Sequence, residues 1–548
     1  MGKKIESLFP YTRALVKSHL ISAGYSYDAL CKPIIGIANS WNEFNHGHLP
    51  QKELVEKIKS GVLSAGGTPV EFNTIGPCDG LAVGNTGMHY ILPMREIIAD
   101  SIEATVNGHP IFDGLVLVAS CDKITPGMLM AAGRLGMPAI HISAGPAIPA
   151  ISFSRSRELR KKFLNGEISE RELAESNSEL YSTCGVCPYI GTANTMNCIA
   201  EGLGMALPGS ALAPASSHRR MGYAFATGEA IVNLVNWDLS CDRIMTRAAF
   251  ENAIRVAAAI GGSSNYILHI PAIASELGIR IKLEDIDHIN SETPLLCKIA
   301  PNGSFSVIDL DVAGGIPAVM KELESVLNLD NQSVSGCIFG EIIAGTQPGD
   351  DKVIRQFTNP YDTEGGIAVL TGNLAPDGAV VKRSAVPQDL YNYSGKAKVF
   401  NSEQECIDAV QSRQVNEGEV LVVTYEGPKG GPGMREMHRL TGILRSFGDN
   451  IALITDGRFS GADSGLVIGY VSPEAAEGGP IAVIQDGDVI KIDLNNRILD
   501  INISDAELKK RLENYSPKIK EISSPLLKRY SSIVNSAAQG ATIHTGRR

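Results

Sequence analysis

The chain has 548 residues, of which 44% are hydrophobic and 20% are charged, so it can form a large core and wholesale disorder is excluded. The formal net charge of −11 argues against nucleic-acid binding, and no apolar run approaches the ~18 residues that a membrane span needs. The first residues contain neither a signal-peptide pattern nor a myristoylation pattern, and we therefore expect a cytoplasmic protein.

Short β-rich runs alternate with helical periodicity from residue 33 to about residue 145. The predicted strands are Pro33–Ala38, Thr68–Thr74, Asp113–Ala119 and Pro138–Ser143, and the predicted helices are Gln51–Ala65, Arg95–Val106 and a helix that begins near Pro126 and ends near Leu135. This alternation predicts an α/β fold with a parallel sheet that helices cover on both faces. In such sheets, ligands bind beyond the carboxyl ends of the strands.

Reactive residue types follow two of these strands, which the pattern predicts to be neighbours. They are the pair Cys78-Asp79 and the run Cys121-Asp122-Lys123. Thiolates are ligands for iron–sulfur clusters, whereas carboxylates suit a hard ion such as Mg²⁺, so one crevice could hold both kinds of centre. Taken singly, Asp122 is better explained as a helix N-cap and Lys123 as a solvated loop residue.

Cys184-x-x-Cys187 is a single CxxC pair, with no second pair and no HxxxH partner. A zinc ribbon or a thioredoxin-type redox pair therefore has little support. We expect Cys187 to precede directly a helix over Gly191–Met205, whose dipole would favour a thiolate. On the residue pattern alone, a metal ligand and a structural thiol remain equally good interpretations of Cys187.

The residue pattern changes near residue 366, where Gly365-Gly366 precedes a strand-rich part, and this predicts two domains, residues 1–365 and 366–548. Strands dominate the second part, and Asn495-Asn496 predicts a hairpin. The Gly-rich run Glu426–Gly433 fits neither nucleotide-binding glycine motif, and a helix is expected from about Met434 to Phe447. Ser460 follows a predicted strand, but it lies outside a GxSxG motif, and alone it would be a turn residue.

Taken together, these motifs resemble the dihydroxy-acid dehydratase/6-phosphogluconate dehydratase family from about Lys32 to Leu512. The resemblance rests on long segments in the family's order: Glu71–Gly80 (EFNTIGPCDG), Ser120–Met130 (SCDKITPGMLM), Gly191–Asn197 (GTANTMN), Tyr425–Met437 (YEGPKGGPGMREM), Thr455–Gly461 (TDGRFSG) and Val471–Ala476 (VSPEAA). It implies an N-terminal α/β domain with a parallel sheet and a smaller, β-rich, barrel-like C-terminal domain. The active site would lie between these two domains, in a homodimer or homotetramer.

The resemblance also implies roles for individual residues. Cys78, Cys121 and Cys187 match ligands of an iron–sulfur cluster, and Cys184 does not. Asp79, Asp122 and Glu436 match magnesium ligands, together with Lys123 as a carboxylated lysine. Ser460 matches the catalytic base.

The implied activity is that of a hydro-lyase, which converts a small 2,3-dihydroxy acid into a 2-keto acid for valine and isoleucine biosynthesis. One branch of the family has its third cysteine near residue 47, where this chain has His46-Gly47-His48. Cys78 is present instead as the third cysteine, and we therefore favour a [4Fe–4S] cluster and keep [2Fe–2S] as the alternative. An aldonic (sugar) acid dehydratase is the alternative substrate assignment, and an iron–sulfur electron-transfer or sensor protein is the alternative from another class.

Overall fold

The computed structural model describes residues 3–444, 451–459, 465–518 and 520–543. The chain forms two compact units from interleaved segments. The first unit comprises Met1–Pro77, Ile97–Val256 and Gly303–Asn359, and the second comprises Cys78–Glu96, Ala257–Asn302 and Pro360–Arg548. The domain boundary at residues 365/366 remains a prediction. Among the described helices, none combines the length and the apolar character needed to cross a bilayer.

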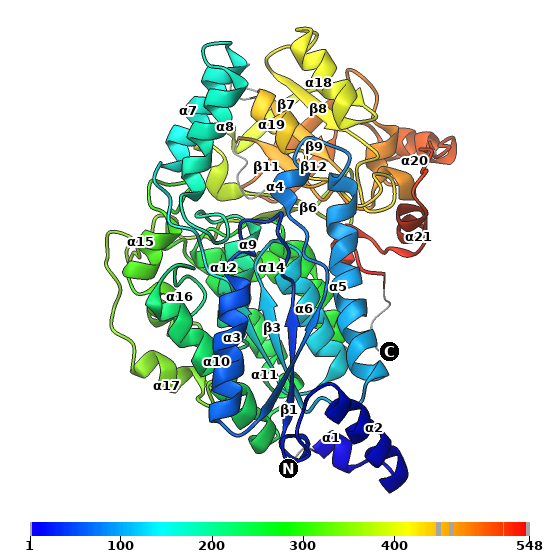
Figure 1. Cartoon of the computed structure of the whole chain (residues 1–548). Coiled ribbons are helices and arrows are strands. Elements are labelled where there is room, and N and C mark those ends of the chain that lie inside the picture. Colours follow the sequence, from blue (N-terminus) through cyan, green and yellow to red (C-terminus); the bar gives the residue numbers. More distant parts are fainter. Residues whose placement is uncertain (1–2, 445–450, 460–464, 519, 544–548) are drawn as a thin grey trace. The chain divides into compact units, whose positions relative to one another are not determined.

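A four-stranded sheet forms the centre of the first unit (Figure 1). Its strands are β1 (Ile34–Asn39), β2 (Thr68–Asn73), β3 (Gly114–Ala119) and β4 (Ala139–Ser143), which pair in parallel in the order β2-β1-β3-β4. Every residue of β1, β3 and β4 is buried, as expected when helices cover both faces of a parallel sheet. The carboxyl ends of all four strands therefore share one edge.

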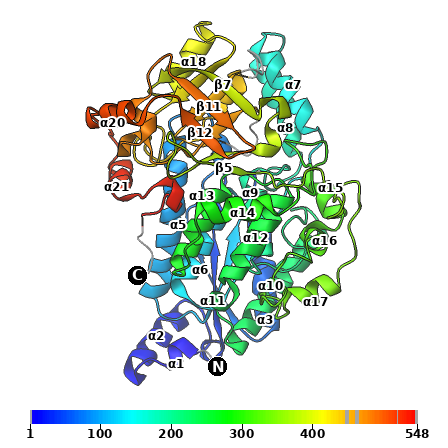
Figure 2. The same ribbon diagram turned by 180° about the vertical axis from the view of Figure 1, so that it is seen from behind.

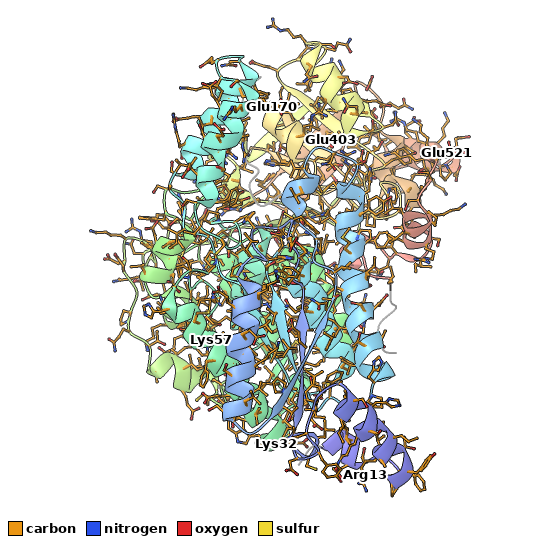
Figure 3. All side chains as sticks on the ribbon, viewed as in Figure 1. Arg13, Lys32, Lys57, Glu170, Glu403 and Glu521 are labelled. Atoms are coloured by element: carbon orange, nitrogen blue, oxygen red, sulfur yellow. The ribbon has the colours of Figure 1, made fainter. Side chains whose placement is uncertain are left out.

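Helices α3 and α10 cover one face of this sheet and α6 covers the other (Figures 1 and 2). The helices wholly within this unit are α1 (Lys3–Glu6), α2 (Pro10–Ser22), α3 (Gln51–Ser64), α6 (Ile124–Leu135), α7 (Phe153–Leu164), α8 (Glu170–Ser178), α9 (Thr192–Gly202), α10 (His218–Trp237), α11 (Cys241–Ile244), α15 (Val307–Val312), α16 (Gly315–Glu322) and α17 (Phe339–Ala344). Helix α3 buries Leu54 and Ile58, whereas its exposed Lys57 points away from the sheet (Figure 3). This division of polar and apolar positions produces the periodicity that predicts the helix.

An eight-stranded sheet organises the second unit (Figure 2). Its strands are β5 (Ala368–Leu370), β6 (Ala379–Val381), β7 (Asn392–Phe400), β8 (Glu419–Val423), β9 (Ala452–Thr455), β10 (Val467–Gly469), β11 (Val489–Asp493) and β12 (Ile498–Ile501), in the order β12-β11-β7-β8-β9-β10-β6-β5. Thr371, directly after β5, forms a bridge with Ile498 of β12, which nearly closes the sheet into a barrel. The predicted fold class, with its barrel-like β-rich part, is confirmed.

The barrel strands enclose a hydrophobic core, and helices α18 and α19 pack over a second core on its outside. The helices wholly within the second unit are α4 (Asp79–Ala82), α13 (Tyr266–Glu276), α14 (Leu283–Ser291), α18 (Glu403–Gln411), α19 (His438–Leu444), α20 (Asp505–Glu513) and α21 (Pro525–Ile533). Two further helices, α5 (Met88–Gly108) and α12 (Arg247–Ala259), contribute residues to both units.

The boundaries of two helices differ from prediction. Helix α5 begins at Met88 rather than Arg95, because Pro93 is tolerated inside it. A proline cannot donate to the carbonyl four residues earlier, here that of His89, and the backbone of Gly433 packs against this carbonyl instead. Helix α19 begins at His438, four residues later than expected, and residues 445–447 of the predicted helix lie outside the described residues.

Helices α3 and α10 approach each other closely at two glycines. A Cβ atom on Gly228 would lie 2.2 Å from the carbonyl oxygen of Ile58, and one on Gly61 would lie 2.0 Å from the carbonyl oxygen of Phe225. Both obstacles are backbone atoms, which cannot rotate away as a flexible side chain can. The contact between these helices therefore requires glycine at both positions.

We predict that Gly228→Ala destabilises the protein by about 1–3 kcal/mol, since the added methyl group must push two helices apart. Gly222→Ala is the matched control, because it lies on the same helix α10 and its Cβ would meet no atom within 4 Å. Alanine there should be neutral or stabilising by about 0.5–1 kcal/mol. The melting temperatures of both variants test this, and equal values would contradict it.

Candidate active site

The run that follows β3 occupies a buried turn before α6. Cys121 is 8% exposed and Lys123 is fully buried, with its Nζ 3.7 Å from Oδ2 of Asp122. The interpretation of Lys123 as a solvated loop residue is therefore wrong. Asp122 is not the N-cap of α6 either, because Lys123 occupies that position. A buried lysine needs a compensating partner, so this turn is built for a specific charge arrangement.

The Cys184–Cys187 segment spans the end of β3 in the first unit. Val186 exchanges backbone hydrogen bonds with the continuation of β4, accepting from Ala147 N and donating to Gly145 O, both at 2.9 Å. On the other side, Gly185 N donates to the carbonyl oxygen of His46, in the loop after β1, at 3.2 Å. Because β3 lies between β1 and β4, this segment crosses the strand end that carries Cys121.

The phenol of Tyr189 lies near both the Cys184–Cys187 segment and the turn after β3. Burial raises its pKa, and the negative charges of Cys187 and Asp122 raise it further. Both groups therefore lie within electrostatic range of one phenol. Asp122, in the turn after β3, and Cys187 thus lie near the same phenol, and a joint site of Cys121, Asp122, Lys123 and Cys187 remains a prediction.

The prediction that Cys187 directly precedes a helix is wrong. Helix α9 begins at Thr192, with Gly191 as its N-cap. The turn between them is held instead by Asn194, whose Nδ2 donates to the carbonyl oxygens of Cys187 at 2.6 Å and Tyr189 at 2.9 Å. The helix dipole acts mainly over the first turn, so it does not explain a thiolate at Cys187.

Cys78 and Asp79 belong to the second unit, where Cys78 is the N-cap of the short helix α4. The prediction that the strands preceding Cys78 and Cys121 are neighbours is wrong, because β1 lies between β2 and β3. Asp79 is 7% exposed. A buried carboxylate and a thiol are therefore adjacent in this turn, as the sequence indicates.

The glycine-rich loop over residues 426–437 packs against the start of α5 within the second unit. A Cβ on Gly433 would lie 1.9 Å from the carbonyl oxygen of His89, and the φ of Gly433 is +82°. Nδ1 of His89 lies 2.8 Å from the carbonyl oxygen of Pro432. Only glycine permits this approach, which ties the loop that carries Glu436 to the segment that carries Cys78 and Asp79.

Glu436 lies in a buried network that the sequence did not reveal. Its Oε1 accepts a hydrogen bond from Nδ2 of Asn265 at 2.7 Å and forms an ion pair with Arg458. Oδ1 of Asn265 also accepts from Arg458 and from the hydroxyl of Tyr470, both at 3.0 Å. Arg458 lies in the TDGRFSG run, a motif from which its importance could have been predicted, whereas Asn265 and Tyr470 lie in no distinctive motif.

Ser460 lies outside the described residues. The described residues on either side of its segment, Phe459 and Gly465, both line a pocket in the second unit. Ser264, Lys382 and Tyr470 supply polar groups to the same pocket, and the hydroxyls of Ser264 and Tyr470 are 3.3 Å apart. This pocket therefore adjoins the network around Glu436.

Comparison with known proteins identifies the family of the chain. Residues 32–342 match the family model described as Dihydroxy-acid/6-phosphogluconate dehydratase N-terminal, and residues 352–541 match the corresponding C-terminal model. The chain belongs to the dihydroxy-acid/6-phosphogluconate dehydratase family. It is 48% identical to the dihydroxy-acid dehydratase of Acetivibrio thermocellus over 97% of each chain. The dihydroxy-acid dehydratases of Halothermothrix orenii and Pyrococcus furiosus are 48% and 47% identical, over 97% of this chain and 98% of each relative.

Membership in the dehydratase family makes the chain a hydro-lyase, as its motifs predict. Enzymes of this family act on small dihydroxy acids and use an iron–sulfur cluster and Mg²⁺. The alternative of an electron-transfer or sensor protein is thereby set aside. None of the ten cysteines, all of which lie in the described part of the chain, forms a disulfide.

Two buried carboxylates hold the glycine-rich loop of this dehydratase in place. Asp456 accepts hydrogen bonds from the backbone N–H groups of Tyr425, Glu426 and Ala475 at 2.8–3.0 Å. Glu474 accepts from those of Lys429 and Gly430 at 2.9 and 2.8 Å. Burial raises the pKa of Asp456 to about 6 and that of Glu474, with the charge of Asp456 as a further cause, to about 8.

This arrangement predicts a pH-dependent stability. Between the ordinary pKa of Glu474, 4.5, and its folded value of about 8, the folded state keeps a proton that the unfolded state has lost. The free energy of unfolding must therefore fall as pH rises through this window. Glu474→Gln keeps an acceptor for only one of the two N–H groups, which lowers its stability at every pH, but it cannot ionise. Its melting temperature relative to wild type should therefore rise from about pH 5 to about pH 8.

The control is Glu513→Gln at the exposed end of α20, which should follow the wild-type curve. Asp456 remains in both proteins, so the difference between the two curves reports the ionisation of Glu474 and its coupling to Asp456. Parallel melting-temperature curves for wild type and Glu474→Gln would contradict the proposed cause.

Proposed function

We propose that the enzyme removes water from a 2,3-dihydroxy acid to give a 2-keto acid, as a dihydroxy-acid dehydratase of valine and isoleucine biosynthesis. The observation that carries this proposal is the 46–48% identity to dihydroxy-acid dehydratases over 96–97% of this chain. The buried cysteine, carboxylate and lysine cluster at the end of β3 supplies donor groups that suit this chemistry. The aldonic acid dehydratase remains the alternative and is an outcome of the test below.

The cluster ligands in this proposal are Cys78, Cys121 and Cys187, which favour a [4Fe–4S] cluster over [2Fe–2S]. Support comes from the way in which the segment with Cys187 crosses the strand end with Cys121. Three thiolates leave one iron of such a cluster without a protein ligand. When bound, the cluster and magnesium supply Lewis-acid stabilisation for the C3 hydroxyl and for the carboxylate and C2 oxygens of the substrate.

The magnesium ligands in this proposal are Asp79, Asp122, Glu436 and a carboxylated Lys123. Carboxylation would convert the buried cation of Lys123 into an anionic oxygen donor, which is the ligand type that magnesium prefers. Asn265 and Arg458 would orient the carboxylate of Glu436, as outer groups commonly orient metal ligands.

The base in this proposal is Ser460, whose Oγ would take the proton from C2 of the substrate. A serine hydroxyl is too weak a base at neutral pH, so a nearby cationic centre must favour its alkoxide. The pocket lined by Phe459 and Gly465 supports a substrate position near this part of the chain. For the whole protein we propose a cytoplasmic homodimer or homotetramer.

The test is anaerobic purification followed by an assay of 2-keto acid formation. The substrates to compare are 2,3-dihydroxy-3-methylbutanoate and gluconate at equal concentrations. We expect the branched-chain acid to be the better substrate by kcat/KM. A preference for gluconate would move the assignment to the sugar-acid alternative, and no turnover of any dihydroxy acid by the cluster-loaded enzyme would overturn it.

We predict that Cys187→Ser loses most of its iron, because one of three proposed cluster ligands is removed. Cys184→Ser is the matched control from the same segment and should keep iron near the wild-type content. Iron and sulfide analysis of both variants after anaerobic reconstitution checks this. Loss of iron in the Cys184 variant with retention in the Cys187 variant would reverse the ligand assignment.

We predict that Lys123→Ala abolishes turnover while the protein keeps its fold and its cluster, because the proposed oxygen donor to magnesium is lost. Lys57→Ala, on the exposed face of α3, is the control and should be fully active. Activity, circular dichroism and iron content are measured together. Wild-type turnover in the Lys123 variant would exclude a magnesium ligand at this position.

We predict that Ser460→Ala lowers kcat by about 10²–10⁴-fold, the usual contribution of a positioned proton-transfer group. Cluster content should be unchanged, and exchange of the C2 proton with deuterium from solvent should stop. Ser532→Ala, an exposed serine on α21, controls for the loss of a hydroxyl. Turnover by the Ser460 variant close to that of wild type would show that another group is the base.

A further inference from the structure

Two tyrosine side chains lie near the sulfur of Cys187. The hydroxyl of Tyr181 lies 3.9 Å from Sγ of Cys187, and the phenol of Tyr189 lies within electrostatic range of the same sulfur. One thiol therefore lies in range of two O–H donors, which belong to different turns of the chain.

Other groups fix both phenols in place. The ring of Tyr181 packs against the ring of His46 with their centroids 4.4 Å apart, and Nδ1 of His46 lies 2.6 Å from the carbonyl oxygen of Gly185. The ring of Tyr189 packs against Phe153 at 4.8 Å, and its carbonyl oxygen accepts a hydrogen bond from Asn194. These contacts hold the hydroxyls beside the sulfur without using the hydroxyls themselves.

Both tyrosine hydroxyls carry a proton at neutral pH, because a phenol ordinarily has a pKa of about 10. A neutral phenol next to a thiolate can only donate its hydrogen bond to the sulfur, because the sulfur then carries no proton.

We propose that Tyr181 and Tyr189 are tuning residues, which donate hydrogen bonds to the Cys187 sulfur once it binds iron and thereby control the electron density at the cluster. This inference rests on the proposed function, because it takes Cys187 as a cluster ligand. It adds two groups to the site that act through the cysteine and need not touch the substrate.

The physical reason lies in the competition for electron density on sulfur. A thiolate that accepts hydrogen bonds donates less charge to iron, and hydrogen bonds to cluster sulfurs are among the factors that set the reduction potential. Iron that receives less charge is a stronger Lewis acid toward a bound hydroxyl. The tyrosines should therefore raise the reduction potential of the cluster and assist the departure of the substrate hydroxyl.

The test uses the reconstituted holoenzyme and the variants Tyr181→Phe, Tyr189→Phe and their combination. Each cluster is titrated with dithionite through redox mediators, so that one electron passes from the added reductant to the cluster. The potential should shift to more negative values in each single variant and further in the double variant. The matched control is Tyr25→Phe in the same unit, whose hydroxyl interacts with the carbonyl oxygen of Pro69, and it should leave the potential unchanged.

A second measurement needs no variant. Resonance Raman spectra of the wild-type holoenzyme in H2O and D2O should show a deuterium shift in a terminal Fe–S(Cys) stretching band, because a hydrogen-bonded sulfur is coupled to the exchanged proton. That shift should shrink in each tyrosine variant. A purely structural role of the phenols would leave this isotope effect intact.

The outcomes separate this inference from the proposed function. If Cys187→Ser retains wild-type iron, the ligand assignment fails and this inference fails with it. If Cys187→Ser loses its iron while the tyrosine variants keep the wild-type potential and deuterium shift, only this inference is overturned. If the wild-type enzyme shows no deuterium shift in any Fe–S(Cys) band, the hydrogen bonds are absent and the inference is likewise overturned.

Discussion

The parallel pairing of β1, β3 and β4 is the constraint on which the first unit depends. Parallel strands leave a sheet at one edge, so the loops after all three strands begin side by side. The Cys184–Cys187 segment lies at this edge. Its backbone forms hydrogen bonds with the loops after β1 and β4, so the segment crosses the end of β3. Cys121 and Cys187, which lie 66 positions apart in the sequence, belong to the same edge of the sheet for this reason.

Buried ionisable groups are the feature that separates these loops from ordinary connections. Lys123, Arg458 and Asp456 are each fully buried, and Glu474 nearly so. Burial of an ionic group costs free energy unless hydrogen bonds and opposite charges offset it, so a core chosen for stability alone would avoid such groups. Here Lys123 lies in the turn with Cys121 and Asp122, and Arg458 pairs with Glu436. Asp456 and Glu474 accept hydrogen bonds from the backbone N–H groups of Glu426 and Gly430, in the loop with Glu436.

The sequence predicts the strands of this molecule better than the contacts between its buried polar side chains. The strands β1, β3 and β4 are short apolar runs between turn signals, and the strand ends carry residue types with distinctive chemistry, so both could be found. The order of the strands is not encoded locally, which is why Cys78 was assigned to a strand next to that of Cys121. Arg458, Asn265 and Tyr470 escaped prediction because Asn265 lies 193 and 205 positions before Arg458 and Tyr470 in the chain.

Cys187 illustrates how a local argument can select a residue for a reason that the structure contradicts. A helix dipole acts over roughly the first turn, and α9 begins at Thr192, beyond its reach for this sulfur. The polar groups near this sulfur are the hydroxyl of Tyr181, in a 3₁₀ turn, and the phenol of Tyr189, in a bend fixed by Asn194. Neither position has a sequence signature, because a donor to sulfur is defined by where two loops meet and not by its spacing along the chain. Hydrogen bonding at the cysteine is therefore a property of the folded edge of the sheet, and it can differ between proteins that share every cysteine.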